Sequence, residues 1–425
     1  MDNVGGEPVD RGRLTGSGPA AAAGERIEEA MHINPGLRVL RRDRSSMQVG
    51  LDGGLVLDGL TDGDCAVIAG LTADRDPAGL AALARQHGVQ GRRVADLVAA
   101  LAPVLCEPPP GRTGLRADRL AGELDQLRAV HHRAAASVLD RRSAAVVRVR
   151  GVGGLATAVL KGLAAGGVGR LLADDGPPIV AAEIGQGGMA LAQLGLDRPV
   201  ALRQVVRTVA PDAAIECRAA GGPITAPDLT VVTATDVVPG RVVAEAGTTP
   251  GVLLPVIARE RDHVVGPLVV PGLTACLACR DRHRADADPA WPALRDQLAV
   301  HAAGPIAATS FVPVSAALAV VQVLAFLDGE HRPASWSAEL VLRVADGRTG
   351  RRPCLPHPAC SCTVAPASTT QPRPAGKVDR PDDSVDRTTP DGAVDGVGGR
   401  SPGGRPRRGP GTGHDSASTA STASP

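Results

Sequence analysis

Hydrophobic and polar positions follow two different rhythms in the early part of the chain. Over residues 37–57, short runs of β-compatible residues are separated by turn signals such as Asp52-Gly53-Gly54, which predicts a small antiparallel sheet. Over residues 62–105, apolar positions instead recur at helical spacing, which predicts helices. Strands followed by helices predict a small winged-helix-like module over residues 31–106.

The rest of the chain has a different organisation. Residues 107–140 are expected to form a linker and a helix, because the Pro108-Pro109-Pro110 run can neither continue a helix nor join a central strand. Over residues 141–364, strand-like apolar runs alternate with helical segments, which predicts an α/β fold with a doubly wound, mostly parallel, Rossmann-like sheet. The polar ends, residues 1–30 and 365–425, are predicted to be a disordered arm and a disordered tail.

Composition and charge narrow the class of partner. The chain carries 46 Lys plus Arg against 45 Asp plus Glu, so no net field favours nucleic acid or an anionic membrane. The N-terminus has no signal-peptide pattern, so the protein is expected to be cytoplasmic. The longest apolar stretch, residues 311–327, contains Pro313, Ser315 and Gln322, and we interpret it as a core helix or a dimer contact.

A glycine-rich turn follows the predicted strand at residues 146–150 and begins a helix. Bare backbone at such a turn can approach phosphate oxygens, and the helix N-terminus adds N–H donors. The acidic residue that takes ribose hydroxyls is expected at the end of the next strand. The glycines are Gly151, Gly153 and Gly154, and the acids are Asp174 and Asp175. A nicotinamide-dependent dehydrogenase would show the same pattern, so the nucleotide stays open at this point.

Two tight cysteine pairs predict a metal site. Cys276 and Cys279 lie in one turn, and Cys360 and Cys362 follow a Pro/His-rich turn much later in the chain. Four thiolates suit tetrahedral zinc in a closed, structural site. The alternatives are disulfides, unmetallated buried thiols, or a site in which His357 replaces one cysteine; Cys354 is a further spare ligand.

Two weaker signals carry alternatives of their own. Cys217, at the end of a predicted strand, is either a thioester nucleophile or a buried core cysteine, and we favour the core. The charged segment 280–292 is expected to be a loop, either solvated or guiding a peptide tail. His283, Asp286 and Asp288 within it have the side chains of a metal cluster, but their spacing fixes no common face.

Several motifs together resemble the ThiF family, whose members resemble ubiquitin-activating enzymes. These are the GVGG turn, the Ala173-Asp174-Asp175 strand end, the TATD segment at 233–236, CLACRDRHR, and HPACSC, within about residues 140–363. The resemblance implies binding of ATP and magnesium, adenylation of the C-terminus of a small carrier protein, a zinc staple and a homodimer. A module placed before such a domain is also similar to the leader-peptide-binding proteins of azoline peptide (RiPP) biosynthesis, which deliver a peptide to a YcaO-type cyclodehydratase.

Carried over by position, the three glycines would cradle phosphates, Asp174 or Asp175 would bind ribose, and Asp236 would lie near magnesium. The family usually grips the triphosphate with an Asn, an Arg-Gln pair and a Lys. This chain keeps Gln186 but has Ala182, Gly185 and Val200 at the other positions, with Arg198 or Arg203 as substitutes and Lys161 as the one lysine before Lys377. Losing two cations removes transition-state stabilisation that is typically worth about 3 kcal/mol per group.

The sequence therefore supports three hypotheses. The first is a binding and scaffold protein that holds a peptide or carrier protein for a partner enzyme and has a degenerate ATP site. The second is an active ATP-dependent adenylyltransferase. The third, a nicotinamide-dependent oxidoreductase, is disfavoured because no His stands in an acid–base motif and the cysteine pairs are then unexplained.

Overall fold

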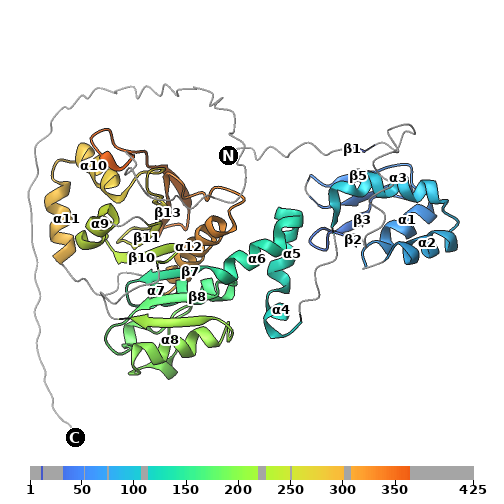
Figure 1. Cartoon of the computed structure of the whole chain (residues 1–425). Helices are drawn as coiled ribbons and strands as arrows, with labels where there is room; N and C mark the ends of the chain where they lie inside the picture. The colour runs from blue at the N-terminus through green and yellow to red at the C-terminus, as the bar shows by residue number, and fades with distance from the viewer. Residues whose placement is uncertain are drawn as a thin grey trace, which may run out of the picture. The chain divides into compact units, whose positions relative to one another are not determined.

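The computed structural model describes residues 11–12, 32–51, 53–73, 76–106, 113–218, 226–248, 251–300 and 308–363 (Figure 1). The predicted arm at residues 1–30, apart from Arg11–Gly12, lies outside the described residues. So do the proline run and the predicted tail at residues 365–425.

The N-terminal module is a small sheet followed by helices, as the sequence predicts. Its sheet has the order β1-β5-β4-β3, antiparallel except where β1 pairs with β5, and β2 pairs with β6. The elements are β1 (Arg11–Gly12), β2 (His32–Ile33), β3 (Val39–Arg41), β4 (Met47–Val49), β5 (Leu55–Leu57), α1 (Asp62–Gly70), α2 (Pro77–Gln86), α3 (Gly91–Leu101), η2 (Ala102–Val104) and β6 (Leu105–Cys106). Leu57, Ile68 and Leu97 are fully buried at its centre; the winged-helix-like character of the module stays a prediction.

Short helices precede the larger domain. They are α4 (Leu115–Arg119), α5 (Ala121–His131), η3 (His132–Ala134) and α6 (Ala135–Ala144). The single helix expected here is interrupted at His132, whose φ is 49°, a left-handed value that a helix cannot continue through.

The larger domain is an eight-stranded sheet with the order β14-β13-β12-β11-β10-β7-β8-β9. Five neighbouring strands are parallel, namely β7 (Val146–Arg150), β8 (Arg170–Asp174), β9 (Ala214–Arg218), β10 (Leu229–Thr235) and β11 (Leu253–Ala258). Three antiparallel strands extend one edge: β12 (Asp262–Val265), β13 (Ala338–Arg343) and β14 (Thr349–Pro353). The sheet is therefore mostly parallel, as predicted.

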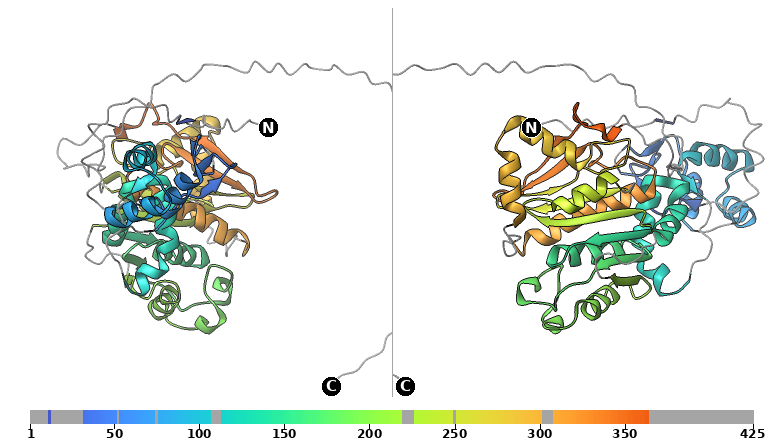
Figure 2. Two further views of the ribbon diagram at one scale, coloured as in Figure 1. Left: turned by 90° about the vertical axis from the view of Figure 1, so that its right-hand side faces the viewer. Right: turned by 60° about the vertical axis from the view of Figure 1, so that its left-hand side comes forward.

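Helices cover both faces of this sheet (Figure 2). Val231 and Leu254 pack into one core with α7 (Gly154–Ala165), α8 (Arg198–Arg207) and α12 (Phe311–Asp328). Their strand neighbours Val232 and Leu253 pack into a second core with α9 (Gly240–Thr248) and α10 (Leu277–Ala287). Because successive strand side chains point to opposite faces, continuous apolar strands are what a doubly wound fold requires.

The long apolar helix α12 is the one described helix that is long and apolar enough to cross a membrane. Ala316, Ala319 and Val323 are buried in the core that α12 shares with α7. Its residues therefore pack in the way the core-helix interpretation predicts.

The charged segment 280–292 is not the loop expected from the sequence. Residues 280–287 belong to α10, α11 (Trp291–Val300) begins at Trp291, and only a short turn separates the two helices. The remaining short elements are η4 (Ala181–Glu183), η5 (Leu191–Gln193) and η6 (Ser361–Thr363).

Candidate functional site

The glycine turn lies at the point where the order of the parallel strands reverses. The chain runs from β7 to β8 on one side and returns to β10 on the other side of β7. In open α/β sheets ligands bind at such a switch point, beyond the carboxyl ends of the strands. The turn after β7, the end of β8 and the end of β10 all lie at this edge, so the fold brings the predicted glycines and acids to one side of the sheet.

Gly151 is fixed by its neighbour on β10. Its φ is +112°, and a Cβ at this position would lie 2.3 Å from Thr233 Oγ1. Gly153 also has a positive φ, +103°, but a Cβ there would meet nothing within 4 Å. Gly154 begins α7 directly after it. The turn therefore brings bare backbone to the N-terminus of α7, which is the geometry of a phosphate cradle.

The two acids at the end of β8 have different surroundings. Asp174 Oδ2 accepts the backbone N–H of Gly151 at 3.1 Å, and its Oδ1 accepts from the Arg148 guanidinium at 3.0 Å. The Asp175 side chain is exposed, and its carboxylate accepts the adjacent Gly176 N–H at 2.8 Å. Asp174 therefore holds the glycine turn in place, whereas Asp175 has a carboxylate that faces solvent.

Arg198 reaches the turn but is already paired. Its guanidinium donates to both carboxylate oxygens of Glu183, each at 2.8 Å, and only 3% of Arg198 is exposed. Arg198 lines a small hollow together with Gly151, Gly153 and Asp174. Glu183 was not singled out from the sequence, and a single Glu in the segment Ala181-Ala182-Glu183 gives no signal of the arginine that it meets 15 residues later.

The remaining residues carried over from the resemblance differ in their exposure. Gln186 is exposed, Val200 is 39% exposed, and Lys161 is partly buried on α7. A Cβ added at Gly185 would lie 2.7 Å from Thr309 Cγ2. Position 185 therefore has little room for the arginine that the family places there.

Asp236 has an unusual backbone conformation at the end of β10. Its φ is +59°, and its backbone N–H donates to Ala258 O at 2.8 Å. Burial, together with the neighbouring Glu260 carboxylate, raises the pKa of Asp236. Non-glycine residues with left-handed backbones gather at functional sites, and this one lies at the same sheet edge as the glycine turn.

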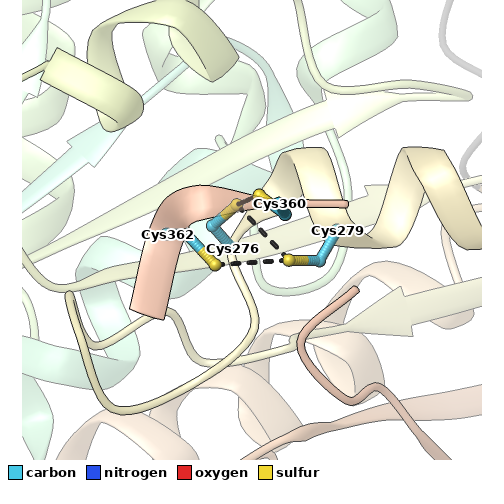
Figure 3. Close-up of side chains that lie close together, drawn as sticks. All are labelled: Cys276, Cys279, Cys360 and Cys362. Carbon is cyan, nitrogen blue, oxygen red and sulfur yellow. Dashed lines mark hydrogen bonds between the residues drawn. The ribbon is translucent and has the colours of Figure 1, made fainter. Parts of the chain in front are cut away.

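The four predicted cysteines come together (Figure 3). The Sγ atoms of Cys276 and Cys360 are 3.7 Å apart, those of Cys279 and Cys362 are 3.3 Å apart, and all four lie within 4.8 Å of one another. Four thiolates bound at ~2.3 Å in a tetrahedron lie about 3.8 Å apart, whereas disulfide sulfurs lie about 2 Å apart. The cluster therefore has the dimensions of a tetrahedral metal site, and the disulfide alternative is wrong for this geometry.

The spare ligands lie outside this cluster. Cys354 is buried beside Cys279, and burial together with the nearby Glu339 carboxylate raises the pKa of its thiol to about 11. His357 instead contacts Asp286, with Nε2 2.8 Å from Oδ2. Cys217 packs against the main core, and burial raises its pKa to about 11. A neutral thiol is a poor nucleophile, so Cys217 has the environment of a core cysteine.

A mostly parallel sheet with a glycine turn at its switch point and a four-cysteine cluster defines a ThiF-like α/β fold, and comparison with solved structures supports this class. E. coli MccB with succinimide has a TM-score of 0.60 at 15% identity, and the match covers 79% of this chain and 99% of that chain. Microcin C7 biosynthetic enzyme MccB with N-formylated MccA has a TM-score of 0.59 at 15% identity, with the same coverage. PaaA has a TM-score of 0.60 at 14% identity, and the match covers 75% of this chain and 99% of that chain.

MccB structures include a complex with ATP. No protein-family model matches the sequence, and no curated protein matches it. Identities this low establish the fold alone. The structural matches extend over the full length of MccB, so the resemblance includes more than the sheet with its glycine turn.

Proposed function

We propose that this protein binds a peptide or small carrier protein for a partner modifying enzyme and that its ATP site is degenerate. The observation that supports the degenerate ATP site is the ion pair between Glu183 and Arg198. Arg198 lines the hollow beside the glycine turn, and Glu183 pairs with it through two hydrogen bonds of 2.8 Å. A cation that is already matched to a carboxylate adds little attraction for a triphosphate.

A second feature supports a weakened nucleotide site. Position 185 is crowded by Thr309, which disfavours the arginine that the family has at this position. The exposed acid Asp175 and Gln186 remain, and they alone supply no positive charge.

The first half of the proposal rests on the solved relatives in fold and on the N-terminal module. MccB is solved with the peptide MccA, and the match covers 79% of this chain. In our proposal the winged-helix-like module grips the peptide, a homodimer of the ThiF-like domain presents it, and a YcaO-type cyclodehydratase modifies it. The cysteine cluster is proposed to hold structural zinc, because a closed set of four thiolates leaves no position for a substrate.

Calorimetry with ATP and magnesium tests the degenerate site. We expect no measurable heat for the native chain and measurable binding for Glu183→Gln, because the amide keeps the shape of Glu183 but frees the charge of Arg198. Glu216→Gln is the matched control, since Glu216 is on the edge strand β9 and also pairs with arginines, Arg170 and Arg218. Micromolar ATP binding by the native chain would contradict a degenerate site.

Fluorescence polarisation tests peptide binding. If a precursor peptide is encoded beside the gene for this chain, its labelled leader segment is the probe. We expect saturable binding that a scrambled leader does not show, and a failure of the leader to bind at high micromolar protein would refute the peptide half of the proposal.

The second candidate is an active adenylyltransferase, and Asp236 favours it. Its left-handed backbone and raised pKa are typical of a reactive edge, and the resemblance places magnesium there. This candidate predicts carrier-dependent exchange of pyrophosphate into ATP that Asp236→Asn abolishes. A sulfur-carrier gene beside this one would also support it, whereas a precursor-peptide gene would support the first candidate.

A further inference from the structure

Helix α10 presents three metal-binding residue types along one face. Cys279, His283 and Asp286 are spaced i, i+4 and i+7, which places them on the same side of a helix. The loop that faces them carries His357 three residues before Cys360. Two of these residues, Cys279 and Cys360, belong to the four-cysteine cluster, so the helix and the loop are held against each other at that end.

The other residues on these two segments also converge. One ligand atom from each of His283, Asp286 and His357 lies within 4.8 Å of the others. The imidazole rings of His283 and His357 are 4.9 Å apart at 66°, and His357 Nε2 is 2.8 Å from Asp286 Oδ2. Asp288, which stood beside these residues in the sequence, is not part of the group and instead accepts the Ala290 N–H.

The backbone orients one ring as a metal ligand is usually oriented. His283 Nε2 lies 2.9 Å from the carbonyl oxygen of Leu355, so in the neutral ring this nitrogen carries the proton and donates it. Nδ1 then has a free lone pair. A backbone carbonyl that accepts from the second ring nitrogen is the common second contact of metal-bound histidines.

We propose that His283, Asp286 and His357 form a second site for a divalent transition metal, separate from the four-cysteine cluster. Two imidazoles and one carboxylate suit zinc, nickel or cobalt, whereas calcium and magnesium prefer sets of oxygens. His283 and Asp286 are exposed, so at least one coordination position is open to water or to a carboxylate from a ligand.

Binding at this site is weaker than at the four cysteines. The Ala359 N–H donates to His357 Nδ1 at 3.0 Å, which places the proton of a neutral ring on Nε2, facing Asp286. A metal at Nε2 replaces that proton and moves it to Nδ1, so the Ala359 hydrogen bond is lost. The metal is therefore expected to exchange readily and to be removed by a mild chelator that leaves the cysteine cluster loaded.

Cobalt titration of the full-length chain tests the site. The chain, purified with zinc and treated with a mild chelator, is titrated with Co²⁺ while its visible absorption and its metal content are measured. We expect one additional Co²⁺ per chain with weak d–d bands and no thiolate-to-cobalt charge-transfer band, because the new ligands are nitrogen and oxygen. His283→Ala and Asp286→Ala should each weaken this binding at least tenfold.

Asp288→Ala is the matched control, since it removes a neighbouring carboxylate from outside the group and should leave the additional cobalt in place. Zinc content and the circular dichroism of each variant check that the fold and the cysteine cluster are intact. Three results would each overturn the proposal: His283→Ala still binds the additional Co²⁺, the native chain binds no additional Co²⁺, or the additional Co²⁺ shows a thiolate charge-transfer band.

Discussion

The two positive-φ glycines of the turn after β7 carry different constraints, although the sequence gives them the same role. Gly151→Ala would place a Cβ 2.3 Å from Thr233 Oγ1, whereas the same change at Gly153 meets open space. A side chain in this backbone region costs about 1–3 kcal/mol by itself. We therefore expect Gly153→Ala to lower the free energy of unfolding by roughly that amount and Gly151→Ala to lower it by clearly more, as measured by urea denaturation. Equal losses would show that the contact with Thr233 relaxes freely.

The residues of this site differ in how well the local sequence pattern predicts them. Gly151 and Asp174 were predicted because a strand, a glycine turn and an acid have a fixed spacing along the chain. Glu183 was missed, since its importance comes only from Arg198, which α8 brings to it. Spacing identifies residues that act through the backbone, and it does not identify ion pairs made between distant turns.

The Asp64 carboxylate makes the stability of the first helix of the N-terminal module depend on pH. It accepts the Thr61 N–H at 2.9 Å and pairs with Arg93 at 3.0 Å. Burial opposes the shift, but the Arg93 and Thr61 contacts outweigh it and lower the pKa of Asp64. A lowered folded-state pKa stabilises the fold above the unfolded value of ~3.9, and this stability is lost as the pH falls through the folded value.

Asp64→Asn should therefore cost about 1–2 kcal/mol at pH 7, and the difference from the native chain should shrink as the pH approaches 3. Urea denaturation followed at pH 7, 5 and 3 measures it. Asp62→Asn is the control on the same helix, because Asp62 is 93% exposed. A difference that stays constant with pH would contradict this role for the Asp64 carboxylate.

At the scale of elements, α6 is attached to α12 by a buried ion pair. Arg142 donates to both carboxylate oxygens of Asp328 at 2.6 Å, and their side chains are 4% and 6% exposed. Arg142→Ala leaves the Asp328 charge buried, so we expect a loss of about 3–5 kcal/mol in the free energy of unfolding. Arg170→Ala, which breaks an exposed pair with Glu216, should cost less than about 1 kcal/mol in the same measurement.

A double variant separates two contributions to stability: the hydrogen-bonded contact between α6 and α12, and the cost of a buried charge without its partner. Arg142→Leu combined with Asp328→Leu removes both charges and fills similar volume, and such replacements are often neutral or stabilising. We expect the double variant to recover most of the stability that Arg142→Ala loses. Failure to recover it would mean that the hydrogen-bonded geometry, and not only the uncompensated charge, holds α6 to α12.

The helices and strands also show where sequence patterns fail to predict structure. The alternation of β7, α7 and β8 was predicted because each element has its own apolar rhythm. Helix α10 was expected to be a loop, because Arg280-Asp281-Arg282-His283 gives no apolar stripe. Its charges are matched by residues distant in sequence, as when Arg280 and Arg284 approach Glu339 on β13.

For the larger domain as a whole, the cysteine cluster connects the start of α10 to the last described residues. Cys276 and Cys360 are 84 residues apart in sequence, so a metal between them closes a long loop, and its binding energy becomes folding energy. A strong chelator should therefore lower the thermal midpoint, and about 3 kcal/mol of lost stability corresponds to roughly 6–12 °C for a domain of this size. Cys360→Ser should reproduce the shift and lower the zinc content. Cys354 lies next to the cluster but outside it, so Cys354→Ala should keep one tightly held zinc per chain. A thermal midpoint unaffected by metal removal would show that the sheet holds these ends together without the metal.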